Sequence, residues 1–589
     1  MQLYHDSRSL DCRAPFGALR CGDVLRLRLY CEEIPRAVSV IFTNQEGTQR
    51  YPMQPADGGA YELRLTMPSV PCLCWYYFCA EDEADTPYYY GNAADELGGL
   101  GQAYTHVPPA FQVTVYDRAY APPAFLHEGI MYQIFPDRYF RDRPILRTRE
   151  DIYLHENWQE PPLALYDPRN GDTHSSDFFG GTLSGITQKL DYLASLHVTV
   201  LYINPIFLSR SNHRYDTGDY TQVDPMLGNE EELRTLCREA EKRGMRVLLD
   251  GVFSHTGDDS LYFNRYGRYP SLGAYQSPDS PYAAWFTFEH FPDKYKCWWN
   301  VVTLPEVNKN DEGYRAFILG EDGIARRWLR CGTSGWRLDV ADELPMSFLR
   351  TLRESVKAEN SAAALLGEVW EDASHKVAYG HMRCYCLGDT LDSVMNYPLR
   401  TAAIDFVMGK TDAYTLVRQI ESLRENYPLP FFYSLMNLMG SHDRPRLLNV
   451  LCGEVWEGVD PLERGACRLS DAQRALAVRR LREMWKLFAA MPGMPSLYYG
   501  DEAGLEGAAD PFCRGTFPWG QEDQEILAIT REALSLRAVR PVLRRGAFSI
   551  TAIDRDSVRI RRFSHSGFDV FGQLLEDADY EVVIHAVRA

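Results

Sequence analysis

The chain lacks any apolar run of about 18 or more residues, the length that a helix needs to cross a bilayer. Its first 15 residues, MQLYHDSRSLDCRAP, also lack the apolar core of a secretory signal peptide. These absences argue against a membrane span and against secretion. We therefore expect a cytoplasmic location.

Positive charge is scarce as well. Lys and Arg total 62 against 81 Asp and Glu, so the formal net charge is -19 at pH 7. Nucleic acids and anionic membranes bind to clustered positive charge, so neither is an expected partner. A neutral ligand is compatible with this composition, and the 36 Tyr and 11 Trp residues suit stacking on sugar rings.

The cysteines lack the spacing of a zinc site. The chain has 14 of them, and its two close pairs, Cys72 with Cys74 and Cys384 with Cys386, are separated by one residue rather than by two. Free, reduced thiols are the expectation.

With 589 residues the chain exceeds the roughly 250 to 300 residues at which a single core stops growing, so several domains are expected. Residues 1–122 contain short alternating runs separated by turn residues, for example at 24–30, 37–44 and 60–67. This pattern predicts an N-terminal β-sandwich. A Pro-rich linker at 120–125 leads out of it.

Residues 123–540 alternate between short apolar strands and helical segments. Eight strand candidates lie at 129–135, 198–207, 246–255, 335–343, 364–370, 392–398, 433–443 and 495–502. Eight β/α repeats predict a (β/α)8 barrel, the TIM barrel of the α/β class. The competing doubly wound open sheet is disfavoured because no Gly-rich dinucleotide fingerprint follows the first strand.

Two further segments complete the organisation. The stretch between the third and fourth strands, about residues 256–310, is rich in Tyr, Pro and Trp and is too long for an ordinary connection, so it predicts a small inserted domain. The tail, residues 541–589, has short β-like runs and predicts a small C-terminal β domain.

Charged residues follow the apolar part of several predicted strands. In a barrel of this type the C-terminal ends of the strands form one rim, where catalytic residues lie. Charges buried there are costly unless they are paired, and a functional rim gives a reason to keep them. The rim residues are Asp250 and His255 on the third strand, Arg337 and Asp339 on the fourth, Glu368 on the fifth, and His442 and Asp443 on the seventh.

Three carboxylates on three strands suit cleavage of a glycosidic bond. One carboxyl group protonates the leaving oxygen, and a second attacks or assists at the anomeric carbon. Arg337 lies two residues from Asp339 on the same strand face, so its charge is expected to keep Asp339 ionised as a nucleophile. The apolar neighbours of Glu368 favour its protonated form and hence the role of acid. An isolated Arg-x-Asp pair would more often be a structural ion pair.

Four blocks resemble the barrel-strand motifs of the α-amylase superfamily, glycoside hydrolase family 13, in the order that the family has them. They are DGVFSH at 250–255, GWRLDVADE at 335–343, GEVW at 367–370 and MGSHD at 439–443. Further resemblances are YQIFPDRY at 132–139, HRYDTGDY at 213–220, LPEVN at 304–308 and PSLYYGDE at 495–502. With its preceding sandwich, which would be of the carbohydrate-binding-module kind, the chain most resembles the neopullulanase, cyclomaltodextrinase and maltogenic amylase group.

The resemblance implies a retaining hydrolase of α-1,4, and in some cases α-1,6, bonds in maltodextrins, cyclodextrins or pullulan, with some transglycosylation. It implies that Asp339 is the nucleophile, Glu368 the general acid and then base, and Asp443 a third carboxylate that grips substrate hydroxyls. The substrate-binding residues that it implies are Arg337, His255, His442, Tyr215, Asp510, Arg514 and Asp250.

Two positions depart from the family pattern. Ser254 stands where calcium-binding members often have an Asn ligand, which puts the usual calcium site in doubt. No metal ligand is predicted and no cofactor is expected to be required, and a structural calcium stays an open alternative. Glu306 stands where the neopullulanase group commonly has Lys.

Several alternatives stay open. Asp250 either contacts substrate or only braces Arg337, and Trp298 and Trp299 either contact sugar or form the core of the inserted domain. The same carboxylates would also serve an α-1,6-specific debranching enzyme or a glucosyltransferase, and a barrel without activity would be a glucan-binding protein. The order of sandwich before barrel predicts a homodimer, in which the N-terminal domain covers the cleft of the neighbouring subunit.

Overall fold

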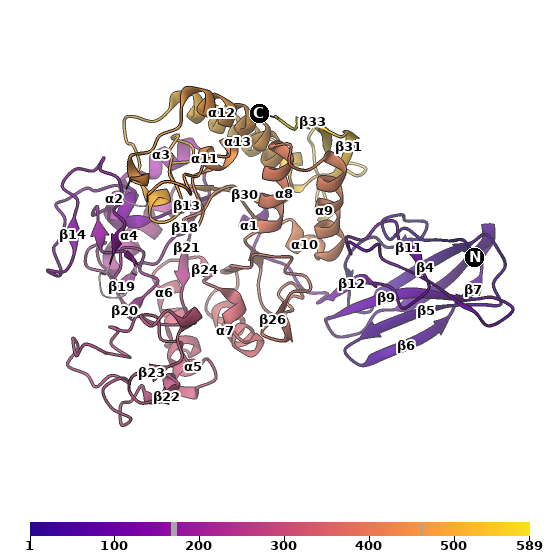
Figure 1. Ribbon diagram of the computed structural model, residues 1–589, viewed down its shortest axis with the longest axis horizontal. Coiled ribbons are helices and arrows are strands. Elements are labelled where there is room, and N and C mark those ends of the chain that lie inside the picture. The colour runs from indigo at the N-terminus through magenta and orange to yellow at the C-terminus, as the bar shows by residue number, and fades with distance from the viewer. Residues whose placement is uncertain (167–172, 461–462, 589) are drawn as a thin grey trace.

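The computed structural model describes residues 1–166, 173–460 and 463–588. Figure 1 shows a β-sandwich at one end of the molecule and a larger body of helices around a barrel at the other. A small C-terminal sheet lies against the helices of this body. The predicted α/β fold class, a TIM barrel between an N-terminal sandwich and a short C-terminal β domain, is confirmed. The exact domain boundaries stay predictions.

The N-terminal sandwich consists of a five-stranded and a seven-stranded sheet. The smaller sheet contains β1 (Leu3–Tyr4), β2 (Arg13–Ala14), β4 (Val24–Cys31), β7 (Gln54–Pro55) and β8 (Ala60–Thr66). The larger contains β3 (Leu19–Arg20), β5 (Ala37–Asn44), β6 (Gly47–Pro52), β9 (Cys72–Glu81), β10 (Pro87–Gly91), β11 (Gln102–Tyr104) and β12 (Phe111–Tyr116).

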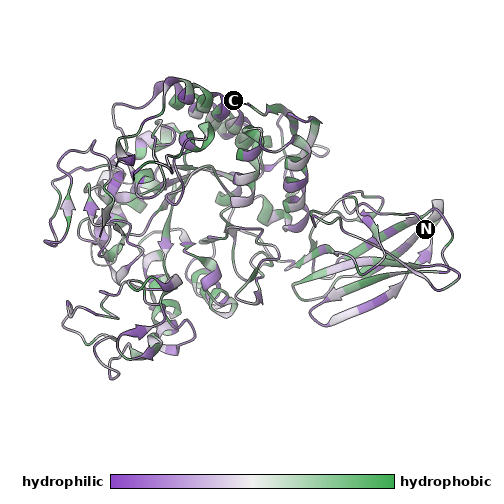
Figure 2. Ribbon diagram, in the orientation of Figure 1, coloured by the Kyte–Doolittle hydropathy of each residue, from purple (hydrophilic) through white to green (hydrophobic). Residues whose placement is uncertain are grey.

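Alternation along β4 explains how the two sheets pack. Leu25, Leu27 and Leu29 are fully buried and point to the same face, whereas Arg26 and Arg28 alternate with them. The buried leucines join the apolar core between the sheets. The same banding of hydrophobic residues is visible along the sandwich strands in Figure 2.

Eight parallel strands form the barrel. In spatial order they are β28 (Ser393–Val394), β25 (Ala364–Gly367), β24 (Gly335–Leu338), β21 (Arg246–Gly251), β18 (Val200–Ile203), β13 (Met131–Ile134), β30 (Met494–Tyr498) and β29 (Met436–Leu438). A bridge between Met395 and Met436 joins the two ends of this order. Seven of the eight predicted segments contain one of these strands completely, and the eighth, 495–502, begins one residue after the start of β30.

The barrel strands are buried on both faces. Met131, Val200 and Leu248 belong to one apolar cluster, and the neighbouring residues Leu201 and Leu249 belong to another, which includes residues of the surrounding helices. Burial on both faces is the pattern of parallel sheets covered by helices. A charged side chain on the inner face therefore needs charged partners on adjacent strands.

The helices surround the barrel in Figure 1. They are α1 (Phe125–Glu128), α2 (Leu183–Gln188), α3 (Leu190–Ser195), α4 (Glu230–Glu241), α5 (Glu312–Leu319), α6 (Ile324–Leu329), α7 (Met346–Glu359), α8 (Tyr397–Val407), α9 (Ala413–Asn426), α10 (Leu429–Phe432), α11 (Leu447–Cys452), α12 (Asp471–Ala490), α13 (Gln524–Val539) and α14 (Pro541–Arg545). Within the described ranges, none of them has the length and apolar character that crossing a bilayer requires.

Helix α4 illustrates how the sequence determines where a helix begins and which of its faces is buried. Asn229 caps it by accepting a hydrogen bond from the Glu232 amide at 3.0 Å. Leu233, Leu236 and Ala240 follow at helical spacing and are buried. The helix therefore turns one apolar face to the barrel and leaves its charged face in solvent.

The segment between β21 and α5 carries the hairpin of β22 (Phe288–His290) and β23 (Lys294–Tyr295), which projects from the barrel in Figure 1. Phe263 stacks on Phe288 with ring centroids 5.9 Å apart and forms part of its core. The described residues thus agree with a compact insertion.

All 14 cysteines of the chain are free thiols.

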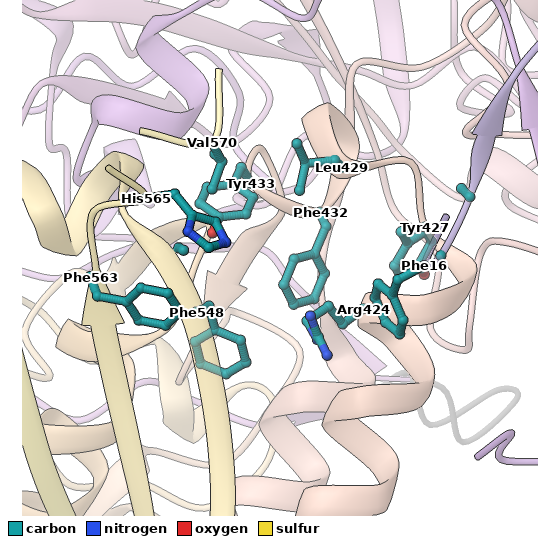
Figure 3. Close-up of a pocket in the computed structure, with 13 residues that line it drawn as sticks. Phe16, Arg424, Tyr427, Leu429, Phe432, Tyr433, Phe548, Phe563, His565 and Val570 are labelled. Atoms are coloured by element: carbon teal, nitrogen blue, oxygen red, sulfur yellow. The ribbon is translucent and has the colours of Figure 1, made fainter. Parts of the chain in front are cut away.

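The C-terminal sheet consists of β31 (Ala547–Asp554), β32 (Ser557–Phe563) and β33 (Tyr580–His585). It meets the sandwich and α9 around a cavity of about 270 Å³, whose wall includes Phe16, Phe432 and Phe548 (Figure 3). The Arg424 guanidinium lies 4.1 Å from the Phe16 ring centre. Mostly apolar side chains line this cavity, and they come from all three parts of the chain.

Candidate active site

Arg337 is fully buried on β24 and contacts three carboxylates. Its Nη1 atom lies 3.0 Å from Asp250 Oδ1 and 3.1 Å from Asp339 Oδ1, and its Nη2 atom lies 2.9 Å from Glu368 Oε2. Asp250 stands directly opposite Arg337 in the register of β21 and β24. One guanidinium therefore ties together the ends of three neighbouring strands.

The sequence predicts that Arg337 acts on Asp339, and the structure adds two further carboxylates to the same guanidinium. Burial, together with the nearby charge of Glu368, raises the pKa of Asp339 well above its usual range, although Arg337 acts in the opposite direction. Arg337 therefore lowers the pKa of Asp339 but does not outweigh the effect of burial.

A backbone turn at Val340 helps to position Glu368. The predicted strand 335–343 ends at Leu338, because Val340 has a φ of 41° and the following residues form a 3-10 turn. A positive φ is strained for a β-branched residue, and such strain is typical of functional sites. In this conformation the Val340 amide donates to Glu368 Oε2 at 2.9 Å, while Trp370 Nε1 donates to Oε1 at 3.0 Å.

Asp443 lies beyond β29 beside two basic side chains. His442 Nε2 is 3.2 Å from Asp443 Oδ2, and Arg514 Nη2 is 3.6 Å from Oδ1. Arg514 also pairs with Asp510 at 2.9 Å. Burial raises the pKa of Asp443, and Arg514 opposes this rise. Asp443, Asp510 and Arg514 thus form a cluster of ion pairs at one side of the site.

His442 and Tyr215 form a stacked pair. Their ring centres are 5.2 Å apart and the ring planes differ by 5°. Gln133 on β13 contacts His442 Nδ1 at 2.8 Å, and the Tyr215 hydroxyl donates to Asp250 Oδ2 at 2.8 Å. The pair is therefore held from both sides, which fixes the ring faces presented to a ligand.

Asp250 lies below these rings and is almost fully buried. Besides Arg337 and Tyr215, it accepts a hydrogen bond from the Tyr202 hydroxyl at 2.6 Å. Both oxygen atoms of the Asp250 carboxylate are therefore engaged in contacts within the protein. These contacts favour the alternative in which Asp250 braces Arg337 and Tyr215 over direct contact with substrate.

A cavity of about 570 Å³ opens over these groups. The predicted site residues that line it are Asp339, Glu368, Asp443, His255, His442, Tyr215, Asp510 and Arg514. Arg337 and Asp250 do not line it but lie beneath its floor. The structure therefore brings together all ten residues, eight of them at the pocket surface and two in support.

Other residues of the pocket wall were not singled out by the sequence. Trp370 follows Glu368 by two residues, and Lys376 lies between the carboxylates of Asp342 and Glu371, with which it forms ion pairs. Loop residues such as Lys376 carry no periodic signal. Trp370, however, stands inside the quoted block GEVW, which could have revealed it.

The two neighbouring tryptophans of the insertion also belong to this wall. Trp298 and Trp299 stack with ring centres 5.0 Å apart, and Trp299 is 70% exposed. An indole that exposed cannot be a core residue. The geometry therefore favours sugar contact over the alternative of a buried core.

No group of three or more His, Cys, Asp or Glu side chains in the described parts of the chain is arranged to hold a metal ion.

Ser254 Oγ lies 2.9 Å from His255 Nδ1, so this hydroxyl orients the histidine ring. His255 Nε2 in turn lies 3.1 Å from the Tyr215 carbonyl oxygen.

Comparison with known proteins agrees with this site. Residues 133–540 match the alpha amylase catalytic domain family. An amylopullulanase of Thermoanaerobacterium saccharolyticum is 37% identical over 99% of the chain, which spans 48% of that relative. A cyclomaltodextrinase of Geobacillus thermopakistaniensis is 33% identical over 73% of the chain and 66% of its own length.

A solved structure resembles nearly the whole molecule. The type III pullulan hydrolase from Thermococcus kodakarensis is 27% identical, covers 95% of this chain and 94% of its own, and superposes with a TM-score of 0.65. The chain spans 33% to 48% of the length of three amylopullulanases that it matches. From the matched barrel and the carboxylates at its rim, the chain belongs to the α-amylase family, glycoside hydrolase family 13.

Proposed function

We propose that this chain hydrolyses α-glucosidic bonds of α-glucans with retention of the anomeric configuration. The observation that carries the proposal is that Asp339 and Glu368 contact the same guanidinium and line the same pocket as Asp443. Retaining glycosidases need two carboxyl groups close to one anomeric carbon. A single Arg337 side chain holds them close together here.

In the first step, the Asp339 carboxylate attacks the anomeric carbon and forms a glycosyl ester. The bond to the leaving sugar breaks as Glu368 gives its proton to the leaving oxygen. In the second step, Glu368, now a carboxylate, takes a proton from water, whose oxygen attacks the anomeric carbon and releases Asp339. If a sugar hydroxyl replaces water, the product is a transferred glycoside.

The remaining groups of the pocket suit sugar binding. Asp443 and His442 present hydrogen-bonding atoms in the same pocket as the nucleophile, and the aromatic rings of Tyr215 and Trp299 offer apolar faces. Maltodextrins, cyclodextrins and pullulan are the substrates that we propose, with cleavage of α-1,4 bonds and also of α-1,6 bonds. Support comes from relatives named amylopullulanase, cyclomaltodextrinase and pullulan hydrolase.

Replacing the acid tests the mechanism. Glu368→Gln is expected to lower kcat on maltoheptaose at least about 100-fold, because general acid catalysis contributes about 10²- to 10⁴-fold. The exposed Glu83→Gln is a matched control that should leave kcat unchanged. Wild-type rates from Glu368→Gln would refute the assignment.

Product analysis separates the alternatives. An α-1,6-specific debranching enzyme would cleave pullulan but not maltoheptaose, and a glucosyltransferase would give products longer than its substrate. A glucan-binding protein without activity would show binding and no turnover on maltoheptaose, β-cyclodextrin or pullulan. We expect turnover, with the α-anomer released first and detected by NMR.

Two further features belong to the proposal. The acid, the nucleophile and the third carboxylate all come from the chain, so the proposed steps use no cofactor. Homodimer formation through the N-terminal domain remains a prediction from the domain order. Sedimentation that shows only monomers at working concentrations would contradict it.

A further inference from the structure

A second cavity, of about 370 Å³, adjoins the active-site pocket. We refer to it as the side pocket. His213 and Leu304 belong to the walls of both cavities. Tyr215 faces the active-site pocket, whereas Asp216, the next residue, faces the side pocket. The two cavities are therefore separated only by a thin partition.

Hydrogen bonds fix the partition in place. The Asp258 amide donates to the Thr303 carbonyl oxygen at 2.9 Å, which joins the beginning of the inserted segment to its end. The Ser211 hydroxyl and amide donate to the Asp216 carboxylate. A ligand that enters the side pocket would therefore meet a preformed wall.

The polar groups of the side pocket suit a neutral hydroxylated ligand. The Arg210 side chain is 29% exposed, and within the described ranges only its Nη2 atom makes a side-chain hydrogen bond, to Asp151 at 3.4 Å. Asp258 accepts from Tyr266 and Arg265 through Oδ2, and its Oδ1 atom makes no hydrogen bond to described residues. A guanidinium donor and a carboxylate acceptor together match a sugar hydroxyl, which both accepts and donates.

The charges around the side pocket are largely paired within the protein. Asp151 forms ion pairs with Arg149, Arg210 and Arg268, and Asp258 forms one with Arg265. A charged ligand would compete with these pairs, whereas a neutral polyol would not. The wall also carries serine and threonine hydroxyls beside apolar surface, which suits the hydroxyl groups and the C–H face of a sugar ring.

We propose that the side pocket receives a glucosyl branch of an α-glucan whose main chain lies in the active-site pocket. This inference rests on the proposed function and names the substrate more closely: α-glucans that carry a branch near the cleaved bond. His213 and Leu304, which belong to both walls, would contact both the main chain and the branch. Linear chains would leave the side pocket to water.

The test compares a branched with a linear substrate. The measured quantity is the ratio of kcat/KM for a maltooligosaccharide with one α-1,6-linked glucosyl branch to kcat/KM for the linear oligosaccharide of equal glucose number. Arg210→Ala and Asp258→Asn are each expected to lower this ratio at least about tenfold, the usual effect of losing one charge-assisted hydrogen bond. Asp322→Asn, whose side chain is 97% exposed, is the control and should leave the ratio unchanged.

An unchanged ratio in Arg210→Ala would overturn the proposal and leave the cavity as a water-filled space. An equal loss on both substrates would also overturn it. Asp258 is buried, so a melting curve must first show that Asp258→Asn folds; the more exposed Arg210→Ala decides the question if it does not.

Calorimetry with Glu368→Gln separates the two proposals. If the wild-type protein fails to cleave any α-glucan, the proposed function fails. The side pocket would still be supported if Glu368→Gln binds the branched oligosaccharide more tightly than the linear one. The double variant, Glu368→Gln with Arg210→Ala, should lose this difference in affinity. Equal binding of both oligosaccharides would contradict it whatever the activity.

Discussion

Arg337 contacts three carboxylates, so removal of its charge affects all of them. In Arg337→Met the pKa of Asp339 should rise further, because the guanidinium opposes the effect of burial. A protonated Asp339 cannot attack, so the acid limb of the kcat/KM profile should move to higher pH as the overall rate falls. Arg337→Lys keeps a charge and should show a smaller shift. An acid limb at the same pH in Arg337→Met would contradict this explanation.

Glu502 is a buried acid outside the pocket. Burial raises its pKa from 4.5 to about 7, although Tyr132 and Tyr192 donate hydrogen bonds to it. A raised pKa in the folded state gives stability that is present below pH 4.5 and is lost as pH rises through about 7. Relative to Glu502→Gln, the wild-type protein should therefore lose roughly 2 to 3 kcal/mol of unfolding free energy between pH 5 and pH 8. Urea melts at both pH values measure this, and a difference independent of pH would exclude it.

At the scale of elements, the start of β24 depends on a glycine. Gly335 has a φ of 142°, and a Cβ atom there would lie 2.1 Å from the Ala364 carbonyl oxygen on β25. Gly335→Ala should push the two strands apart and lower the unfolding free energy by roughly 2 to 3 kcal/mol. Gly458→Ala, where a Cβ meets nothing within 4 Å, is the control. Equal melting temperatures for both variants would show that β24 tolerates the added atom.

At the scale of the whole molecule, ion pairs attach the sandwich to the barrel. Glu425 on α9 is 3% exposed and lies 2.9 Å from Arg13 and 3.1 Å from Arg8 of the N-terminal domain. Glu425→Gln leaves the fully buried Arg13 without a charged partner, which costs about 3 to 5 kcal/mol. The sandwich should loosen, and a protease should cut the linker at 120–125 faster. The exposed Glu96→Gln in the N-terminal domain is the control and should be cut at the wild-type rate. A wild-type rate in Glu425→Gln would rule out this attachment.

Much of this architecture follows from local patterns in the sequence. The alternation in β4 and the helical spacing in α4 specify which faces are buried, because strand and helix periods act within a few residues. The position of Asp339, Glu368 and Asp443 at the rim follows too, since parallel barrel strands all end on one side. The sequence by itself thus determined the fold class and the main candidate residues.

Tertiary structure decided how those residues meet. Arg337 contacts Asp250, 87 positions away in the sequence, because the two residues are paired in the register of β21 and β24. This contact holds Asp250 beneath the pocket. Trp299 and the side pocket depend on the path of the inserted segment. Such contacts join residues that are distant in sequence, and no local period encodes them. Their geometry exists only once the barrel has closed and the loops have packed against it.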